Sequence, residues 1–182
     1  MNGILGFASL LKIPNLTVDQ LKKYVSIIEK SGERMLNIIN DLINISKIEA
    51  GQMEVSISPC NINDQMEYIY TFFKPEAERE GLDISYSNTL TSNEAIINTD
   101  GEKFYAILTN LIKNSIKYSN EGSINFGYTK KGKYLEFYVK DDGIGIPKDR
   151  QEAIFDRFVQ ADIEDIRVYE GAGLGLSITK AY

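Results

Sequence analysis

One long segment with a seven-residue repeat constrains this chain more than any other feature. Between Thr17 and Gly51 two series of positions recur every seven residues, namely Leu21, Ile28, Met35 and Leu42, and Tyr24, Ser31, Ile38 and Ile45. Such a repeat is the a and d seam of a coiled coil or helical bundle. Thr17 and Gln20 have capping-box spacing and predict where this helix begins, and Gly51 predicts where it ends.

The apolar stripe on this predicted helix is wider than a two-stranded seam. Val25, Leu36, Ile39 and Ile43 extend it, so several helices must cover it. Residues 1–12 also have helical spacing, but they are too few to cover the stripe alone. We expect residues 1–50 of two chains to form a homodimeric four-helix bundle, and the alternative is an internal core helix of a single chain.

The pattern changes after residue 52. Alternating residues predict strands at 53–57, 84–86, 95–97, 123–129 and 134–139, and helical spacing predicts helices at 61–80, 100–118 and 174–181. This part should be a mixed sheet with its helices on one face. The sequence therefore predicts an α+β protein in which a helical hairpin, residues 1–51, precedes a mixed domain, residues 52–182.

Composition excludes several classes of function. The 182 residues carry 20 basic and 26 acidic side chains, a net charge of −6, which argues against nucleic acid as a partner. The chain has no histidine, so a Ser-His-Asp triad and most zinc sites are excluded. Its single cysteine, Cys60, and the lack of an apolar run near the roughly 18 residues of a membrane span favour a cytoplasmic segment without membrane contact.

Two glycine clusters stand out in the last third of the chain, at residues 141–147 and 171–176. Glycine lets backbone amides approach a phosphate or a base closely, although paired glycines also occur in ordinary turns. The second cluster opens a predicted helix, where amides favour an anion. It is not a Walker loop, because no Lys-Ser or Lys-Thr follows its glycines, and no strand leads into it as in a dinucleotide fingerprint.

The helix predicted from Asp100 has a polar face. Asn110, Asn114 and Lys117 are spaced four and three residues apart, with Tyr118 directly after them. An Asn carbonyl can bind Mg²⁺ when phosphate oxygens and waters complete the ligand set, and Lys offsets phosphate charge. Without other signals, such residues are more often solvated surface.

The order of these segments resembles a known family. NLIKNSIKY at 110–118, DDGIG at 141–145, IFDRF at 154–158 and GAGLGL at 171–176 resemble the N, G1, F and G2 boxes of sensor histidine kinases. Residues 31–51 resemble the second helix of that family's dimerisation and phosphotransfer domain. The resemblance implies that residues 52–182 form a Bergerat-type α/β sandwich, the catalytic ATP-binding domain.

The resemblance also assigns roles to residues. Asn114 would coordinate Mg²⁺, Lys117 would touch phosphate, Tyr118 would lie against the adenine, and Asp141 would accept a hydrogen bond from the adenine amino group. Residues 147–170 would form a lid with hinge anchors at Phe155 and Phe158. The remaining expected nucleotide contacts are Asn110, Gly143, Gly145, Gly171, Gly173, Leu174 and Gly175.

The implied function is a protein-histidine kinase that uses ATP and Mg²⁺. The γ-phosphate would pass to a His upstream of Met1, and then to an Asp of a response-regulator receiver domain. The resemblance further implies more strands after Tyr182, and either a cytoplasmic protein or the cytoplasmic part of a membrane-anchored sensor. The alternatives are an ATPase of the same superfamily, which would need a Glu where Asn110 stands to activate water, and a nucleotide-gated scaffold without catalysis.

Overall fold

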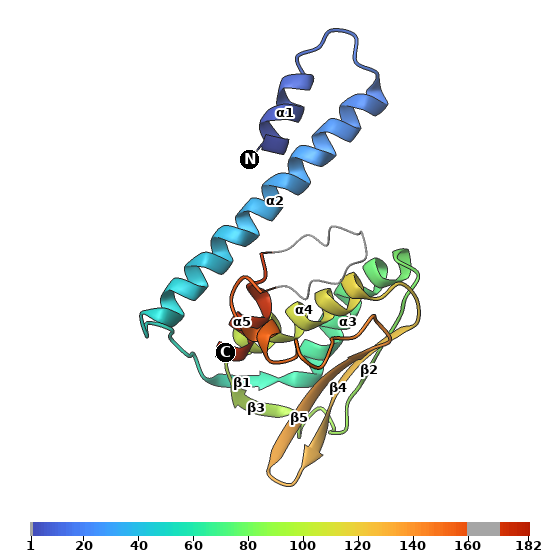
Figure 1. Cartoon of the computed structure of the whole chain (residues 1–182). Helices are drawn as coiled ribbons and strands as arrows, with labels where there is room; N and C mark the ends of the chain where they lie inside the picture. The colour runs from blue at the N-terminus through green and yellow to red at the C-terminus, as the bar shows by residue number, and fades with distance from the viewer. Residues whose placement is uncertain (1, 160–171) are drawn as a thin grey trace. The chain divides into compact units, whose positions relative to one another are not determined.

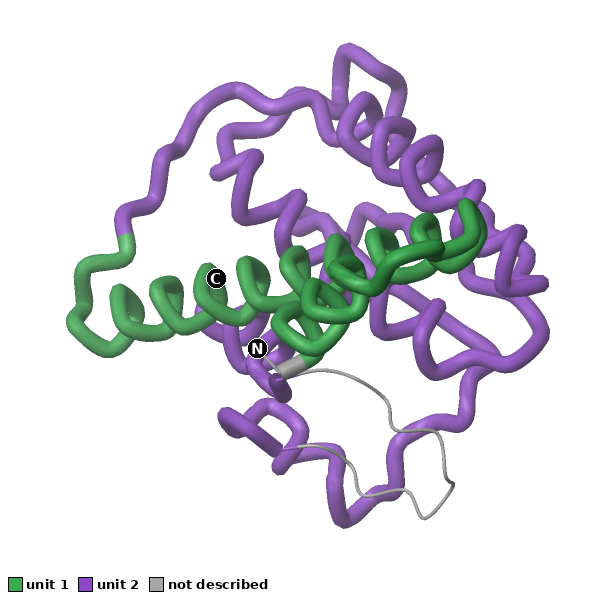
Figure 2. The backbone as a smooth tube through the Cα atoms, turned by 90° about the horizontal axis from the view of Figure 1, so that it is seen from above, with its two compact units in different colours: residues 1–53 green, residues 54–182 purple. Residues whose placement is uncertain are grey.

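The computed structural model describes residues 2–159 and 172–182, and it divides into two compact units. Unit 1 is Met1–Met53 and unit 2 is Glu54–Tyr182, coloured green and purple in Figure 2. Among the described residues, no helix is both long and apolar enough to span a bilayer.

Unit 1 is a helical hairpin of α1 (Asn2–Leu10) and α2 (Val18–Glu49), labelled in Figure 1. The predicted capping box starts α2, because Gln20 N donates to Thr17 Oγ1 over 3.2 Å while Thr17 N donates to Gln20 Oε1 over 3.0 Å. Gly51 has φ +63°, and Gln52 N donates to Lys47 O. This is a Schellman motif, so both predicted ends of the helix are confirmed.

The two helices of unit 1 touch along a narrow strip. The rings of Phe7 and Tyr24 lie 5.5 Å apart between centroids, and Gly3 faces Ser31 closely. Ile45 is buried, but most apolar residues of α2 are exposed in the single chain; these are Val18, Leu21, Val25, Met35, Leu36, Ile38, Ile39, Leu42 and Ile43. The hairpin alone therefore leaves the apolar stripe of α2 uncovered.

Unit 2 alternates strands and helices. Its elements are β1 (Ser58–Asn61), α3 (Ile62–Arg79), β2 (Asp83–Ser87), β3 (Ile96–Thr99), α4 (Gly101–Tyr118), β4 (Ser123–Lys131), β5 (Tyr134–Asp141), the short 3₁₀-helix η1 (Ala153–Phe155) and α5 (Gly175–Ala181). β4 pairs in parallel with β2 and antiparallel with β5, and β1 pairs antiparallel with β3. In Figure 1 the helices α3, α4 and α5 lie on one side of the strands, as predicted.

Two details of the predicted sheet are wrong. The five strands form a three-stranded sheet, β2-β4-β5, and a separate pair, β1-β3, rather than one mixed sheet. The first strand is not 53–57 but Ser58–Asn61, which includes Pro59. Val55 and Ile57 are exposed, so their alternation does not mark a buried strand face.

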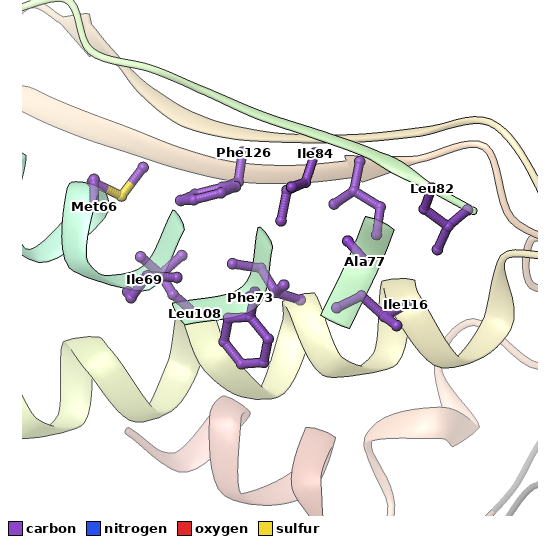
Figure 3. Close-up of a cluster of buried hydrophobic side chains, with 11 residues drawn as sticks. Met66, Ile69, Phe73, Ala77, Leu82, Ile84, Leu108, Ile116 and Phe126 are labelled. Atoms are coloured by element: carbon purple, nitrogen blue, oxygen red, sulfur yellow. The ribbon is translucent and has the colours of Figure 1, made fainter. Parts of the chain in front are cut away.

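The core of unit 2 lies between α3, α4 and the three-stranded sheet (Figure 3). Residues three and four apart on each helix face the sheet, where Ile84, Ile124 and Phe126 meet them; the helix residues are Met66, Ile69, Phe73, Ala77, Leu108, Ile112 and Ile116. This places the opposite face of α4 outside that core.

Hydrogen bonds of the Asp100 carboxylate fix the start of α4. Asp100 caps the helix by accepting from Lys103 N over 3.0 Å, and its carboxylate also accepts from Ser56 N over 2.9 Å. Lys103 Nζ lies 2.8 Å from Asp100 Oδ2 and donates to Glu54 O over 2.6 Å. The hydrogen bonds from Lys103 and Ser56 hold the pKa of Asp100 well below its usual range. Asp100 thus ties residues 54–56 to the first turn of α4.

Candidate functional site

The candidate site begins on the part of α4 that does not face the core. Leu108, Ile112 and Ile116 bury one side of the helix, so Asn110 and Asn114 project elsewhere. Asn114 is half-buried, and the structure gives its side chain no hydrogen bond within the described part of the chain. Its amide oxygen is therefore available to a ligand.

Asp141, at the end of β5, is tied to α4 and to its own loop. Ser115 Oγ donates to Asp141 Oδ2 over 2.8 Å, and Gly143 N donates to Asp141 Oδ1 over 3.0 Å. Two donors fix the orientation of this exposed carboxylate, and each oxygen keeps a free lone pair. The carboxylate can therefore accept a further hydrogen bond from an amino group.

Gly143 allows the loop after β5 to approach the end of α4. A Cβ at this position would lie 2.7 Å from Tyr118 O, 2.8 Å from Asp141 Oδ1 and 2.9 Å from Ser119 Oγ. Ile144 N also donates to Tyr118 O over 3.1 Å. Glycine is thus required for the backbone to pass these three oxygens, while Gly145 takes φ +69° in open space.

Ser119 contributes a buried hydroxyl to the same place. Its Oγ has no hydrogen-bond partner among residues 2–159 and 172–182, although the residue is only 8% exposed. A buried hydroxyl without a hydrogen bond costs stability, so this group is available to hydrogen-bond a ligand.

Lys117 and Tyr118 form a pair at the end of α4. Lys117 Nζ donates to Tyr118 Oη over 2.9 Å and lies 4.5 Å from the centroid of its ring. Both residues lie in the last turn of α4, where Ser115 also binds Asp141. This arrangement combines an apolar ring face with a positive charge.

The Asn110 side chain is less exposed to solvent than an ordinary surface side chain. Its Nδ2 donates to Thr179 Oγ1 of α5 over 2.8 Å. Its Oδ1 lies where a Cβ of residue 175 would be, so a larger residue at the start of α5 would have to displace the Asn110 side chain. Buried Leu174 and Ile178 fix α5 against the rest of unit 2.

The predicted hinge anchors lie near the loop that precedes α5. Phe155 ends η1, with Lys180 Nζ 5.7 Å from its ring centroid. Phe158 has φ +62°, and its N–H donates to Gly173 O over 3.0 Å. Gly171 and residues 160–170 of the predicted lid lie outside the described residues, so their predicted roles stay predictions.

A nucleotide fits this arrangement chemically. Asp141 offers a hydrogen-bond acceptor for an amino group, and Gly143 lets the backbone of its loop pass close to the end of α4. The Ser119 hydroxyl has no hydrogen-bond partner among the described residues. No cluster of three or more acidic, Cys or His side chains lies within the described residues, so a metal here would depend on Asn114 together with phosphate oxygens and waters. Mg²⁺ bound to a nucleotide fits that donor set.

A separate open groove of about 1050 Å³ lies where β1, α3 and α4 begin. Its lining includes Cys60, Asp64, Tyr68 and Tyr105, and burial together with Asp64 raises the pKa of the Cys60 thiol. None of the predicted nucleotide contacts lines this groove, so it is distinct from the candidate site.

The sequence prediction missed three residues of the site. Ser115 orients Asp141, Ser119 faces Gly143, and Thr179 binds Asn110. A signal existed for the first two, since they directly follow Asn114 and Tyr118. Thr179 carried no signal, because its contact depends on how α5 packs.

Family models divide the chain in the same order as its two units. Residues 1–51 match the His Kinase A (phospho-acceptor) domain, and residues 99–182 match the histidine kinase-, DNA gyrase B-, and HSP90-like ATPase domain. The fold and the site thus define an ATP-binding domain of that class. Together with the relatives below, these matches show that the chain belongs to the sensor histidine kinase family.

Relatives match almost the whole chain. It is 33% identical to the autoinducer 2 sensor kinase/phosphatase LuxQ of Vibrio parahaemolyticus and 36% identical to the sensor protein GacS of Pseudomonas syringae, over 99% of the chain in both cases. The chain spans about a fifth of the length of each relative, 21% and 20%. Full-length ShkA in complex with AMPPNP is similar in structure, with a TM-score of 0.76, 29% identity and coverage of 99% of this chain and 37% of ShkA.

Proposed function

We propose that this chain is the ATP-binding core of a two-component sensor histidine kinase. It would bind ATP with Mg²⁺ and present the γ-phosphate to a His that lies outside this chain, from which the phosphoryl group passes to an Asp of a response regulator. The observation that carries the proposal is the hydrogen-bonded set of Ser115, Asp141 and Gly143 at the end of α4.

The residues of the site have separable tasks. Asp141 accepts a hydrogen bond from the adenine amino group, in an orientation that Ser115 and Gly143 N fix. Tyr118 lies along the base, and Lys117, held on its ring, supplies positive charge toward the phosphates. Asn114 supplies an amide oxygen to Mg²⁺, which when bound neutralises phosphate charge.

Asn110 favours a kinase over a hydrolase. An ATPase of this superfamily would place a Glu one turn before Asn114 to take a proton from water, whereas an amide cannot accept that proton. In addition, Asn110 is engaged with Thr179. Slow hydrolysis is therefore expected even when ATP is bound.

Two partners follow from the family. The exposed apolar stripe of α2 supports a homodimer through the helices of residues 1–50, because a second copy would cover Leu21, Met35 and Leu42. The second partner is a response-regulator receiver domain, which accepts the phosphoryl group. The matched phospho-acceptor domain supports both.

Calorimetric titration with MgATP tests the binding site. Asp141→Asn should weaken ATP binding about a hundredfold, since a charge-assisted hydrogen bond is lost. Asp142→Asn is the matched control, because Asp142 accepts from Ser123 N and Oγ instead, and it should bind within twofold of the unchanged chain. Equal ATP affinity in Asp141→Asn would remove Asp141 from the base pocket.

Labelling with γ-phosphate-labelled ATP tests the reaction. The chain contains no His, so it should bind ATP without acquiring acid-labile phosphate. The parent protein, with its acceptor His, should become labelled. Rapid hydrolysis by the chain would instead favour the ATPase, and a parent protein that binds ATP without labelling would favour the scaffold.

A further inference from the structure

The contact between α4 and α5 reaches beyond the residues that would touch a nucleotide. Asn110 stands one turn before Asn114 and donates to Thr179 Oγ1 over 2.8 Å, across the two helices. The same amide packs against Gly175, where a Cβ would clash with the amide in its present position. Both contacts fall at the point where the glycine loop, residues 172–175, passes into α5.

These contacts constrain the orientation of α5 more strictly than apolar packing does. Leu174 and Ile178 are buried and hold α5 against the rest of unit 2. Apolar contacts alone, however, allow a short helix to shift or rotate slightly. A side-chain hydrogen bond fixes both distance and angle, and the close approach at Gly175 removes the space in which α5 could move toward α4. Asn110 and Thr179 together therefore set the position of the loop relative to Asn114.

We propose that Asn110 and Thr179 form a strut that positions the glycine loop for the nucleotide phosphates. Both are positioning residues in this inference, which rests on the proposed ATP-binding function and assigns Asn110 a task other than direct contact with the nucleotide. Loss of the strut should weaken the binding of ligands that carry phosphates. It should not weaken the binding of the base, which Asp141 and Tyr118 would contact at the other end of α4.

A double-mutant cycle measured by calorimetry with MgATP tests the strut. Thr179→Val keeps the shape of the side chain but removes the acceptor, and it should weaken MgATP binding about tenfold. Thr179→Ser keeps the hydroxyl and should bind within twofold of the unchanged chain. Asn110→Ala should lose about as much as Thr179→Val, and the double variant should lose no more than either single variant.

Adenosine separates a positioning role from a general structural one. Its affinity should stay within twofold in all variants, while ATP and ADP lose affinity together. Thr109→Val is the matched control on α4, because its hydroxyl bonds only to Tyr105 O and Ala106 O of the same helix, so ATP affinity should not change. Thermal melts without nucleotide identify any variant that fails to fold, and Thr179→Ala then replaces Thr179→Val.

Several outcomes would overturn the strut. They are additive losses in the double variant, a Thr179→Ser variant as weak as Thr179→Val, an equal loss for adenosine, or unchanged ATP affinity in Thr179→Val. If the unchanged chain binds no ATP, the proposed function itself fails, which is a different result from failure of the strut alone.

Discussion

The two units of this chain differ in how far they bury their apolar side chains. Unit 2 encloses an apolar core between two helices and a sheet, and Met66, Ile69 and Phe73 have no exposed surface. In unit 1, Ile45 is the one buried apolar residue among those described, and α2 displays a full stripe. Unit 2 thus buries its own core, whereas the stripe of unit 1 would be covered in the proposed homodimer.

The largest difference should appear in core truncation. Phe73→Ala should lower the free energy of unfolding of unit 2 by about 4 kcal/mol, because a buried aromatic ring leaves a cavity. Its neighbour Phe72 is 54% exposed, so Phe72→Ala should cost under about 1 kcal/mol. Urea denaturation measures both. Similar losses for the two variants would contradict the assigned core.

The apolar stripe of unit 1 should respond through association. Leu42→Glu should weaken dimerisation about a hundredfold, or about 2.7 kcal/mol, because it places a charge in the seam. Asn37→Glu adds the same charge outside the stripe and should leave the dimer intact. Light scattering over a concentration series measures this. A monomer at every concentration of the unchanged chain would remove the bundle.

Acid should act on unit 2 through Asp100. Its pKa is lowered in the folded state, so its contribution to stability is present above the ordinary pKa near 3.8 and is lost as the pH falls below that value. Asp100→Asn should therefore be less stable than the unchanged chain at pH 7, with a gap that narrows toward pH 3. Thermal melts at a series of pH values check this. A gap that does not depend on pH would contradict the carboxylate's role.

The smallest expected effect has the opposite sign. Ser119→Ala removes a buried hydroxyl without a partner, so it should raise the free energy of unfolding of the nucleotide-free chain by about 1 kcal/mol. Ser115→Ala, in contrast, breaks the bond to Asp141 and should lower it by a similar amount. Destabilisation by Ser119→Ala would mean that this hydroxyl has a partner in solution.

Helix ends were predictable because local chemistry decides them. The capping box at Thr17, the stop at Gly51 with φ +63°, and the cap at Asp100 each depend on a few neighbouring residues. Strand β1 was not predictable in the same way. Met53, Val55 and Ile57 alternate but pair with no strand in the described part of the chain, whereas Ser58–Asn61 pairs with β3, which lies far along the chain.

The residues of the candidate site also fall into two groups, those predictable from a local motif and those whose contacts depend on packing. Asn114 and Asp141 are recognisable because their motifs are local, and the structure brings α4 and the end of β5 together through Ser115. The partner of Asn110 depends on how α5 packs, so the sequence offered no signal for Thr179. The close approach of Gly175 to the Asn110 amide likewise becomes visible only in the structure.

The parallel pairing of β2 with β4 also sets an order of events during synthesis. Asp83–Ser87 leaves the ribosome well before Ser123–Lys131, and β3 and α4 lie between them in the chain. Until β4 emerges, β2 has no neighbour in its sheet, and the apolar side of α3 has only part of its cover. Unit 2 therefore cannot complete its sheet and core during synthesis before about residue 127 has been made.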